Sequence, residues 1–440
     1  MTTSSNTGIA ARLEALISPL AGGALPVHLT VWDGSSAGPT DAPHVTLNSP
    51  QAIRRLLWHP GELGAAQAYV TGELEVEGDL VQGLSAVRAT LKARGVTGGR
   101  PPARTFVEAT KLARELGVLG APLRAPATQI AVRGRLHSVG RDRDVIHNHY
   151  DLSNEFYSLI LDDHMAYSSA YVTGADLDGE ESEAYSLEDA QRDKLDLVCR
   201  KAGLDQRPGM RFLDIGCGWG SLSLHAASAF GAQVTGVTIS KEQKAFIDAR
   251  IAERGLGDKV EIRLQDYREI DDPPFEAVAS LEMGEHVGER NYATYADTLA
   301  RCASDEAQIV IQQMSRHDGH PGGGPFIEAY IAPDMTMRPV GQTVAFLERA
   351  GLEVRDVHAM REHYVWTVRA WQRRFEASKD QLTKLVGEEV VRVWELYLAG
   401  GLLAFQDGRM GVDQITAVRR RDGMSALPAV RPASWSDPRV

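Results

Sequence analysis

Between about residue 190 and residue 316, short apolar segments alternate with patterns typical of amphipathic helices. The apolar segments lie at 210–216, 232–240, 260–266, 275–283 and 307–315. Strands separated by helices of about 10–15 residues indicate βαβ units and a parallel sheet. The predicted fold class is therefore α/β, with a doubly wound, Rossmann-like sheet. Ligands of such sheets bind beyond the carboxyl ends of the strands, so the residues there are the first candidates for a functional site.

The first predicted strand runs into a glycine-rich loop, LDIGCGWGS, at residues 213–221. Gly216, Gly218 and Gly220 allow the backbone to turn tightly and to approach a ligand closely. Their spacing, Gly-x-Gly-x-Gly, differs from the Gly-x-Gly-x-x-Gly pattern of dinucleotide-binding proteins. Asp214 precedes the loop and can accept a hydrogen bond from a ligand ammonium group.

Polar residues also follow the next two predicted strands. Thr238, Ser240 and Gln243 follow the second strand, and Gln265 and Asp266 follow the third. The amide and carboxylate of the last pair suit the edge of an adenine ring. Together with the glycine-rich loop, these residues predict a nucleotide-type site.

The fourth strand is followed by two carboxylates and an imidazole, Glu282, Glu285 and His286. Charged side chains are seldom buried unless they are paired or used in chemistry. Two nearby carboxylates raise the pKa of one of them, which suits a general base near neutral pH. The alternative for Glu282 is a solvent-facing or salt-bridged residue, and His286 is expected to be a structural hydrogen-bond partner.

Composition and pattern divide the chain into four regions. Residues 1–95 are expected to form a small α+β domain, and residues 96–144 a basic linker or helical segment. Residues 145–425 hold the predicted sheet, with a lid at about 316–375 that receives the substrate, and residues 426–440 are expected to be a flexible tail. Residues 111–144 carry seven Lys or Arg against three acidic residues, which fits either a solvated helix face or a surface for anionic lipid headgroups.

The overall charge and the cysteines narrow the class of protein. A net charge of −12 argues against nucleic-acid binding, which needs a basic face. Cys199, Cys217 and Cys302 have neither the spacing of a metal site nor that of a disulfide framework, so no metal is predicted. The sequence shows no signal peptide and no run of about 20 apolar residues. We therefore expect a soluble, cytoplasmic protein.

Several motifs, in a consistent order, resemble the cyclopropane-fatty-acyl-phospholipid synthase family of class I S-adenosylmethionine-dependent methyltransferases. The resemblance covers about residues 145–421 and favours the actinobacterial branch that makes 10-methylene, methyl-branched precursors. The motifs that carry it are HYDLSNEFY at 149–157, MAYSSAYV at 165–172, DIGCGWGS at 214–221, GVTISKEQ at 236–243, EHVGERNY at 285–292, FIEAYIAPDM at 326–335, HYVWTVRAW at 363–371 and LYLAGGLLAFQDG at 396–408.

The resemblance implies S-adenosylmethionine as cofactor and a methyltransferase sheet with a helical lid insertion. The implied cofactor-binding residues are Tyr150, Tyr167, Ser168, Asp214, Gly216, Gly218, Gly220, Thr238, Ser240, Gln243, Gln265 and Asp266. It also implies a reaction in which the double bond of an acyl chain attacks the sulfonium methyl group and leaves a carbocation. Aromatic rings stabilise such a cation, and Tyr150, Tyr167, Tyr171, Tyr364 and Trp366 are candidates, each with core packing as the alternative.

In this family a bound bicarbonate ordinarily removes the proton, held by a Cys, a Glu, a His and a Tyr. Ser169 stands at the Cys position, Glu285 at the Glu position and Tyr364 at the Tyr position. The expected His-Thr-Ile is replaced by Gln312, Gln313 and Met314, and Glu282 stands where cyclopropane synthases usually have glycine. These departures leave open whether bicarbonate is used or is replaced by a protein carboxylate. His317, close to the missing His, is a further candidate for its role.

The expected catalytic residues are thus Glu285, Tyr364, Ser169, Gln312 and Glu282. The departures favour a 10-methylene product over cyclopropane, on a phospholipid-bound unsaturated chain such as oleoyl. The resemblance further implies attachment at the inner membrane surface, a separate flavin-dependent reductase as partner, and a homodimer. A small-molecule N- or O-methyltransferase and a non-catalytic lipid-binding scaffold are the alternatives from other classes.

Overall fold

A computed structural model describes residues 8–96, 103–130, 152–317 and 322–437. The chain divides into two compact units, and each is assembled from segments that are distant in sequence. The first unit comprises Met1–Ile130, Pro325–Tyr330 and Val386–Leu403. The second unit comprises Ala131–Gly324, Ile331–Leu385 and Ala404–Val440.

The first unit is a small α+β structure around a four-stranded sheet of order β2-β1-β3-β4. Its strands are β1 (His28–Val31), β2 (Ser36–Ala37), β3 (His44–Leu47) and β4 (Leu74–Val76). Its helices are α1 (Ile9–Ile17), α2 (Gln51–Trp58), α3 (Glu62–Val70), α4 (Leu80–Ala93), α5 (Ala103–Glu115) and α12 (Pro325–Tyr330), with most of α16 (Glu388–Gln406). The buried residues of its strands, Leu29, Val31 and Leu47, are apolar.

The first unit extends beyond the boundary expected at residue 95. Helix α5 supplies Leu112 and Ala113 to the same buried cluster as Leu29 and Val31 of β1. The described part of the expected linker is therefore packed structure, because its helix carries an apolar stripe that needs a partner. Residues 131–144 of that segment lie outside the described residues.

The second unit contains a seven-stranded sheet of order β10-β11-β9-β8-β5-β6-β7. The strands are β5 (Arg211–Ile215), β6 (Gln233–Thr238), β7 (Val260–Leu264), β8 (Phe275–Leu281), β9 (Ala303–Arg316), β10 (Glu353–Ala359) and β11 (Met410–Val418). Strands β5 to β9 pair in parallel, and β11 runs antiparallel to both β9 and β10. The predicted α/β class with a doubly wound sheet is confirmed.

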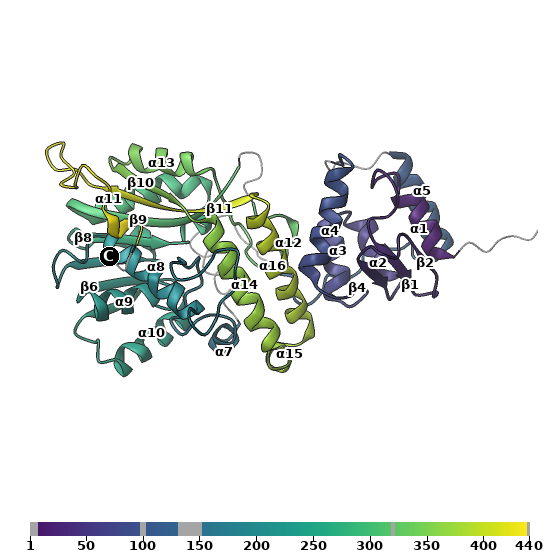
Figure 1. Ribbon diagram of the computed structural model, residues 1–440, viewed down its shortest axis with the longest axis horizontal. Helices are drawn as coiled ribbons and strands as arrows, with labels where there is room; N and C mark the ends of the chain where they lie inside the picture. The colour runs from purple at the N-terminus through teal and green to yellow at the C-terminus, as the bar shows by residue number, and fades with distance from the viewer. Residues whose placement is uncertain (1–7, 97–102, 131–151, 318–321, 438–440) are drawn as a thin grey trace, which may run out of the picture. The chain divides into compact units, whose positions relative to one another are not determined.

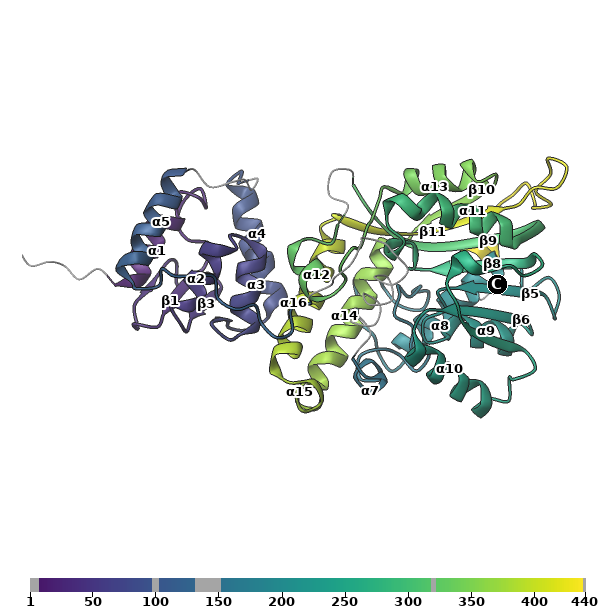
Figure 2. The same ribbon diagram turned by 180° about the vertical axis from the view of Figure 1, so that it is seen from behind.

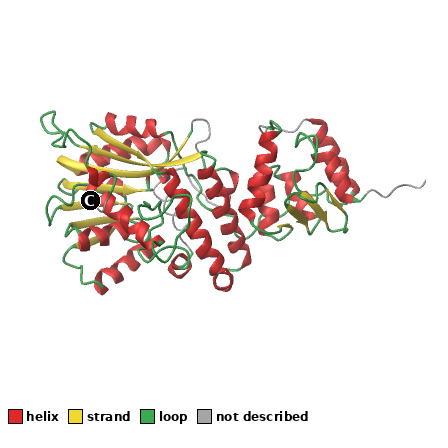
Figure 3. Cartoon of the chain, in the orientation of Figure 1, coloured by secondary structure: helices red, strands yellow, loops and turns green. Residues whose placement is uncertain are grey.

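Helices cover both faces of this sheet, which Figures 1 and 2 show from opposite sides and Figure 3 shows by element type. The helices of this unit are α7 (Asn154–Ser158), α8 (Leu187–Lys201), α9 (Ser221–Ala229), α10 (Lys241–Glu253), α11 (Tyr292–Cys302), α13 (Val340–Arg349), α14 (Arg361–Ala377) and α15 (Lys379–Val386). Side chains of α8, α9 and α10 form one apolar cluster with the sheet, and those of α11 and α13 form another.

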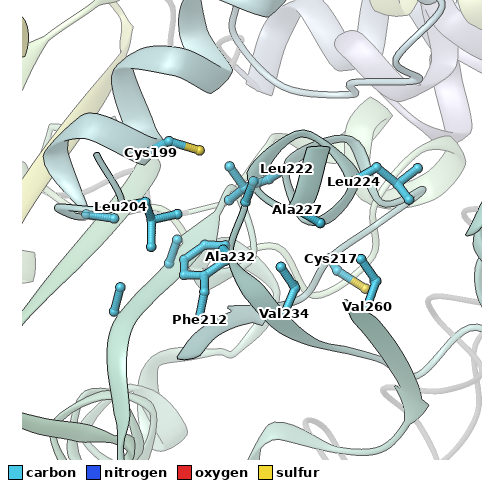
Figure 4. Packing of buried hydrophobic residues seen from close by; sticks show 14 of the residues in the cluster. Cys199, Leu204, Phe212, Cys217, Leu222, Leu224, Ala227, Ala232, Val234 and Val260 are labelled. Atoms are coloured by element: carbon cyan, nitrogen blue, oxygen red, sulfur yellow. The ribbon is translucent and has the colours of Figure 1, made fainter. Parts of the chain in front are cut away.

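The central strands β5 and β8 are buried on both sides because helices cover both faces of the sheet. In β8, Ala277 and Ala279 belong to the cluster beneath α8 and α9, whereas Val278 belongs to the cluster beneath α11. Figure 4 shows the first cluster, where Phe212 of β5 and Val234 of β6 lie among side chains of the flanking helices. All three cysteines are free and buried.

The strand order places a topological switch point between β5 and β8. From β5 the chain adds β6 and β7 on one side, and then crosses to add β8 and β9 on the other. The connections on the two sides leave in opposite directions, which opens a crevice at the carboxyl ends of β5 and β8. The glycine-rich loop follows β5 and the two carboxylates follow β8, so the fold brings these two motifs together.

Two expectations about the C-terminal part are changed by the structure. The segment 316–375 does not form one lid, because it includes β10 of the sheet and α13, whose Leu347 is buried in the sheet's core. The described residues of the expected flexible tail are also packed. Trp435 is 5% exposed, and Tyr171 donates to the carbonyl of Ser436 at 2.5 Å. Within the described ranges, no helix combines the length and apolarity needed to cross a membrane.

Candidate active site

A cavity lies at the carboxyl ends of β5, β6, β7 and β8. It joins residues from both sides of the switch point. Among the residues that line it are Tyr167, Ser168, Asp214, Gly216, Gly218, Thr238, Gln243, Gln265, Asp266 and Glu282. These ten residues were predicted as site residues from the sequence, because they directly follow predicted strands or belong to the motifs upstream of the first one.

The glycine-rich loop bends around one end of this cavity. Gly216 and Gly218 have φ angles of 76° and 55°, in the left-handed region that favours glycine. A Cβ atom on Gly216 would come within 2.6 Å of Met283 Cγ, whereas one on Gly218 would meet nothing within 4 Å. The backbone at Gly218 is thus open to the cavity and accessible to a ligand.

Asp214 is buried at the base of the loop. Its carboxylate accepts a hydrogen bond from Ser223 Oγ at 2.7 Å, and the residue is 2% exposed. Burial raises the pKa of Asp214 to about 6. A carboxylate in this setting gains from a cationic ligand group such as an ammonium, because such a group restores the charged form.

The far side of the cavity carries fixed polar groups. Thr238 Oγ1 donates to Gln243 Oε1 at 2.7 Å, and Gln265 Nε2 donates to the carbonyl of Glu269 at 2.9 Å. The Asp266 carboxylate is held by Arg268, whose Nε and Nη2 lie 2.8 and 2.6 Å from its oxygens. These side chains are oriented before a ligand arrives, which lowers the entropy cost of binding.

Three residues expected to bind the cofactor are not found in the cavity wall: two lie elsewhere, and one is outside the residues that the structure describes. Gly220 does not line the cavity but caps α9, and a Cβ there would come within 2.9 Å of Ile247. Ser240 also does not line it, because its hydroxyl caps α10 by accepting from Gln243 N at 3.2 Å. Tyr150 lies outside the described residues.

Aromatic rings gather at the cavity wall around Tyr167. The ring centroid of Tyr167 lies 6.5 Å from that of Trp219 and 5.4 Å from that of Trp371. Trp219, which sequence reasoning did not single out, lines the cavity from within the glycine-rich loop. By contrast, Trp366 is fully buried beside Tyr185, and Tyr171 packs on His363, so both belong to the core.

The carboxylate of Glu282 is the centre of a hydrogen-bonded group at the end of β8. Ser169 N and Gln312 Nε2 donate to its Oε1 at 2.8 and 2.7 Å, and Tyr364 OH donates to its Oε2 at 2.8 Å. Burial raises the pKa of Glu282, and these three donors oppose that shift. Four of the five residues expected to be catalytic are therefore in one group.

Glu285, the fifth, is directed elsewhere. Its side chain is fully buried, and its Oε1 accepts a hydrogen bond from Met314 N at 2.5 Å, while its carbonyl accepts from Thr336 N at 2.8 Å. Burial, and then the charge of Glu282, raise the pKa of Glu285 to about 8. Burial thus raises the pKa of both carboxyl groups, and with a pKa of about 8 Glu285 is mainly protonated at pH 7.

Lys194 of α8 is a buried cation that sequence reasoning missed. It is 0% exposed and donates to Ser168 Oγ at 2.8 Å, and its charge acts on Glu282 and Asp214. Burial lowers the pKa of Lys194 to about 8. The sequence spacing could have indicated its burial, because Lys194 lies four residues after Ala190 and four before Val198, on the buried stripe of its helix.

The two histidines near the carboxylates have different positions. His286 lines the cofactor cavity next to Met283 and Val287. His317 lines a separate cavity with Arg316, Arg361 and Gln406. The structure therefore does not bring His317 to the group around Glu282, where the missing imidazole was expected.

Comparisons with known proteins agree with this arrangement. The family model described as mycolic acid cyclopropane synthetase matches residues 137–415. The chain is 35% identical to a probable fatty acid methyltransferase of Pseudomonas putida, over 92% of this chain and 95% of that protein. It is 32% identical to the tuberculostearic acid methyltransferase UfaA1 of Mycobacterium tuberculosis, over 90% of this chain and 88% of that protein.

Solved structures give the same fold. The crystal structure of mycolic acid cyclopropane synthase CmaA1 complexed with SAH and CTAB superposes with a TM-score of 0.57 at 27% identity, covering 62% of this chain and 97% of that chain. That structure holds the demethylated form of S-adenosylmethionine. The cavity described above suits the same cofactor, since the Asp214 carboxylate would accept from its ammonium group and the glycine-rich loop would lie beside its amino-acid portion.

Proposed function

Because the chain belongs to the mycolic acid cyclopropane synthetase family, we propose that it adds a one-carbon unit to the double bond of a phospholipid-bound unsaturated acyl chain. It is an S-adenosylmethionine-dependent methyltransferase that acts on lipid acyl chains. We assign an oleoyl-type chain as substrate and a 10-methylene chain as product. When bound, the cofactor supplies an electrophilic methyl group.

One observation carries this proposal. The carboxyl group of Glu282 lines the same cavity as Asp214 and the glycine-rich loop. A carbocation formed next to the transferred methyl group must lose a proton, and this carboxylate supplies a base at the cavity wall. The rings of Tyr167 and Trp219, on the same wall, stabilise positive charge through their quadrupoles.

The choice of product follows from the order of steps after methyl transfer. Proton loss from the new methyl group with ring closure gives cyclopropane, whereas a hydride shift followed by loss of a methyl proton gives an exocyclic methylene. We favour the methylene because the residues around the base differ from those of cyclopropane synthases at Glu282 and at residues 312–314. The 32% identical relative named tuberculostearic acid methyltransferase supports a product other than a ring.

The test is a lipid analysis in a host that lacks such lipids, supplied with oleate and expressing this chain alone. Both products add one CH2, so mass cannot separate them, but vinylidene and cyclopropyl protons have well-separated NMR signals. We expect vinylidene signals, and none from a Gly218→Val variant. Cyclopropyl signals would show that the reaction ends in ring closure and would overturn the methylene product. Neither signal, with the cofactor still bound, would favour a methyltransferase acting on the N or O atom of a small molecule.

We further propose that the enzyme works at the inner membrane surface and that a flavin-dependent reductase consumes the methylene product. A methylene group is an alkene, so its conversion to a methyl branch needs a reductant that methyl transfer does not provide. Exposed apolar side chains on the first unit, with Trp58 51% and Leu119 47% exposed, support contact with a bilayer. A homodimer remains part of the proposal, to be measured by light scattering.

A further inference from the structure

The donors expected to hold the family's bicarbonate already bind a carboxylate of this chain. The positions that correspond to the bicarbonate site are Ser169, Gln312 and Tyr364, with Glu285 as the fourth. In the structure, the first three donate to Glu282 at 2.7–2.8 Å, two of them to Oε1 and one to Oε2. The carboxylate of Glu282 thus takes the place of the small anion, with one oxygen bound to the backbone and an amide and the other to a phenol.

An unusual backbone conformation at Glu282 directs its side chain toward these donors. Its φ angle is 50°, in the left-handed region that non-glycine residues seldom adopt. Its N–H donates to the carbonyl of Gln312 at 2.6 Å, so the turn is tied to β9. A strained conformation of this kind persists only where the surroundings fix it, and such residues cluster at functional sites.

Gln312 is oriented to donate rather than to accept. Its Oε1 accepts a hydrogen bond from Gln414 Nε2 at 2.9 Å, which leaves its NH2 group facing Glu282 Oε1 and the carbonyl of Ser169, 3.2 Å away. Gln312 and Gln414 are both fully buried. The replacement of the expected His by Gln312 therefore fits a site whose anion is built into the protein.

Bicarbonate does not fit beside Glu282. The three donors are engaged, and a second anion within hydrogen-bond distance of this buried carboxylate would cost several kcal/mol of repulsion. At the fourth position, Glu285 contributes a buried carboxyl group whose Oε1 accepts from Met314 N, and not a cation that would attract an anion. The charge of the buried Lys194 acts on Glu282, Asp162 and Asp214 together, so it leaves no surplus positive charge for a further anion.

We propose that Glu282 is the base of the reaction and that this enzyme uses no bicarbonate. The inference rests on the function proposed above. A C–C bond forms between an alkene carbon and the transferred methyl group as the S–CH3 bond breaks, and neutral S-adenosylhomocysteine leaves. After the hydride shift, a methyl C–H bond breaks, its electron pair forms the methylene C=C bond, and Glu282 takes the proton. The proton passes to water once the product has left.

The first test uses the wild-type protein and needs no variant. Carbon-13-labelled bicarbonate is titrated into the protein with S-adenosylhomocysteine bound, and its NMR line width is followed. In parallel, turnover on oleoyl phospholipid vesicles is measured in buffer freed of carbon dioxide and again with added bicarbonate. We expect no saturable line broadening and the same turnover in both buffers. Saturable binding, or turnover that falls at least tenfold without bicarbonate, would overturn the proposal.

The second test compares three variants. Glu282→Gln keeps the size of the side chain and removes the base, so turnover should fall by about 10²–10⁴-fold, the usual contribution of a general base. Glu282→Gly reopens the anion site and should gain both saturable bicarbonate binding and turnover that rises with bicarbonate. The exposed Glu253→Gln on α10 is the matched control and should keep wild-type turnover. Undiminished turnover in Glu282→Gln would remove Glu282 as the base.

The two proposals fail in different ways. A wild-type protein that makes no acyl product would remove the proposed function, while the line-width measurement would still report whether the anion site is closed. If the wild-type protein makes methylene or cyclopropane lipid only with bicarbonate, the proposed function stands and the assignment of Glu282 as the base is wrong. Affinity for S-adenosylhomocysteine shows that each variant has folded.

Discussion

At the scale of single residues, the two carboxyl groups after β8 differ in the hydrogen bonds that they accept. Glu282 is held by three donors, whereas Glu285 has one, and its Oε2 is buried with no hydrogen-bond partner among the described residues. Hydrogen bonds donated to a carboxylate favour its charged form, so the donors oppose the effect of burial at Glu282 more than at Glu285. The sequence predicted that one of the pair would have a raised pKa, whereas burial raises the pKa of both, and to about 8 for Glu285.

The raised pKa of Glu285 predicts how stability depends on pH. Glu285 has a pKa of about 8 in the folded protein and about 4.5 when unfolded. Between these values the folded state holds a proton that the unfolded state lacks, so stability falls as pH rises from about 4.5 to 8, by at most about 1.4 kcal/mol per pH unit. A Glu285→Gln variant lacks this titration, so its free energy of unfolding, measured in urea at pH 6 and 8, should fall less.

The control for this prediction is Glu289→Gln, because Glu289 is an exposed carboxylate nearby that binds Arg338. It should follow the wild-type pH dependence. Equal slopes for wild type and Glu285→Gln would contradict the assignment of the neutral proton to Glu285. Turnover of Glu285→Gln should also fall at least tenfold less than that of Glu282→Gln, because Gln replaces a neutral carboxyl group with a similar shape.

At the scale of elements, the sheet strands could be predicted and the group around Glu282 could not. The central strands β5 and β8 and the middle of β9 are buried on both faces, so each contains a run of apolar residues that the sequence displays, whereas the edge strand β7 alternates buried and exposed residues. The contacts between Ser169, Glu282 and Tyr364 join residues more than 80 positions apart, and no local pattern encodes such a distance. The family resemblance named these residues, but it favoured Glu285 over Glu282 as their partner.

The glycine-rich loop gives a prediction at this scale. A valine at Gly218 puts its side chain into the open space beside the loop and forces a φ of 55° that β-branched residues avoid. We expect the affinity for S-adenosylhomocysteine, measured by calorimetry, to fall at least a hundredfold. Gly209→Val is the matched control, since Gly209 has a φ of 77° and equal space but does not line the cavity. Equal losses in both variants would mean that backbone strain alone explains the effect.

At the scale of the whole molecule, the chain does not fold as consecutive domains. The first unit takes Pro325–Tyr330 and Val386–Leu403 from within the region that matches the family model. Tyr69 OH donates to Glu395 Oε2 at 3.0 Å, and Arg392 Nη1 donates to the carbonyl of Tyr69 at 3.0 Å. The domain boundary expected at residue 95 missed this because linker composition reports local flexibility and not which distant segments pack together.

A truncated chain tests this interleaving. Removal of residues 1–130 takes away the packing partners of α12 and of the part of α16 that belongs to the first unit. One of these partners is Ile130, whose N–H donates to the carbonyl of Ala329 at 2.8 Å. Several polar contacts of about 1 kcal/mol each are lost along with apolar burial, so the melting temperature should fall by at least about 5 °C. Removal of residues 438–440 is the control. A truncated chain with the melting temperature of the intact one would show that the first unit is dispensable.

The last prediction concerns the bilayer. Trp58 Nε1 donates to the carbonyl of Gly120 at 3.0 Å, which joins its half-exposed ring to the loop that carries exposed Leu119. Lys111, Arg114 and Arg124 on the same unit are exposed cations that suit anionic headgroups. Binding to phosphatidylglycerol vesicles should exceed binding to phosphatidylcholine vesicles in a sedimentation assay.

Replacement of both Trp58 and Leu119 by Ser should weaken this binding at least tenfold, because insertion of a large apolar side chain contributes about 1.5–3 kcal/mol and each 1.4 kcal/mol is a factor of ten. The matched control replaces Met424 and Val430, which are 71% and 78% exposed on the second unit, by Ser. Equal weakening by both double variants would mean that exposed apolar area in general drives the association. Unchanged binding of the Trp58 and Leu119 variant would move the contact with the bilayer to another surface.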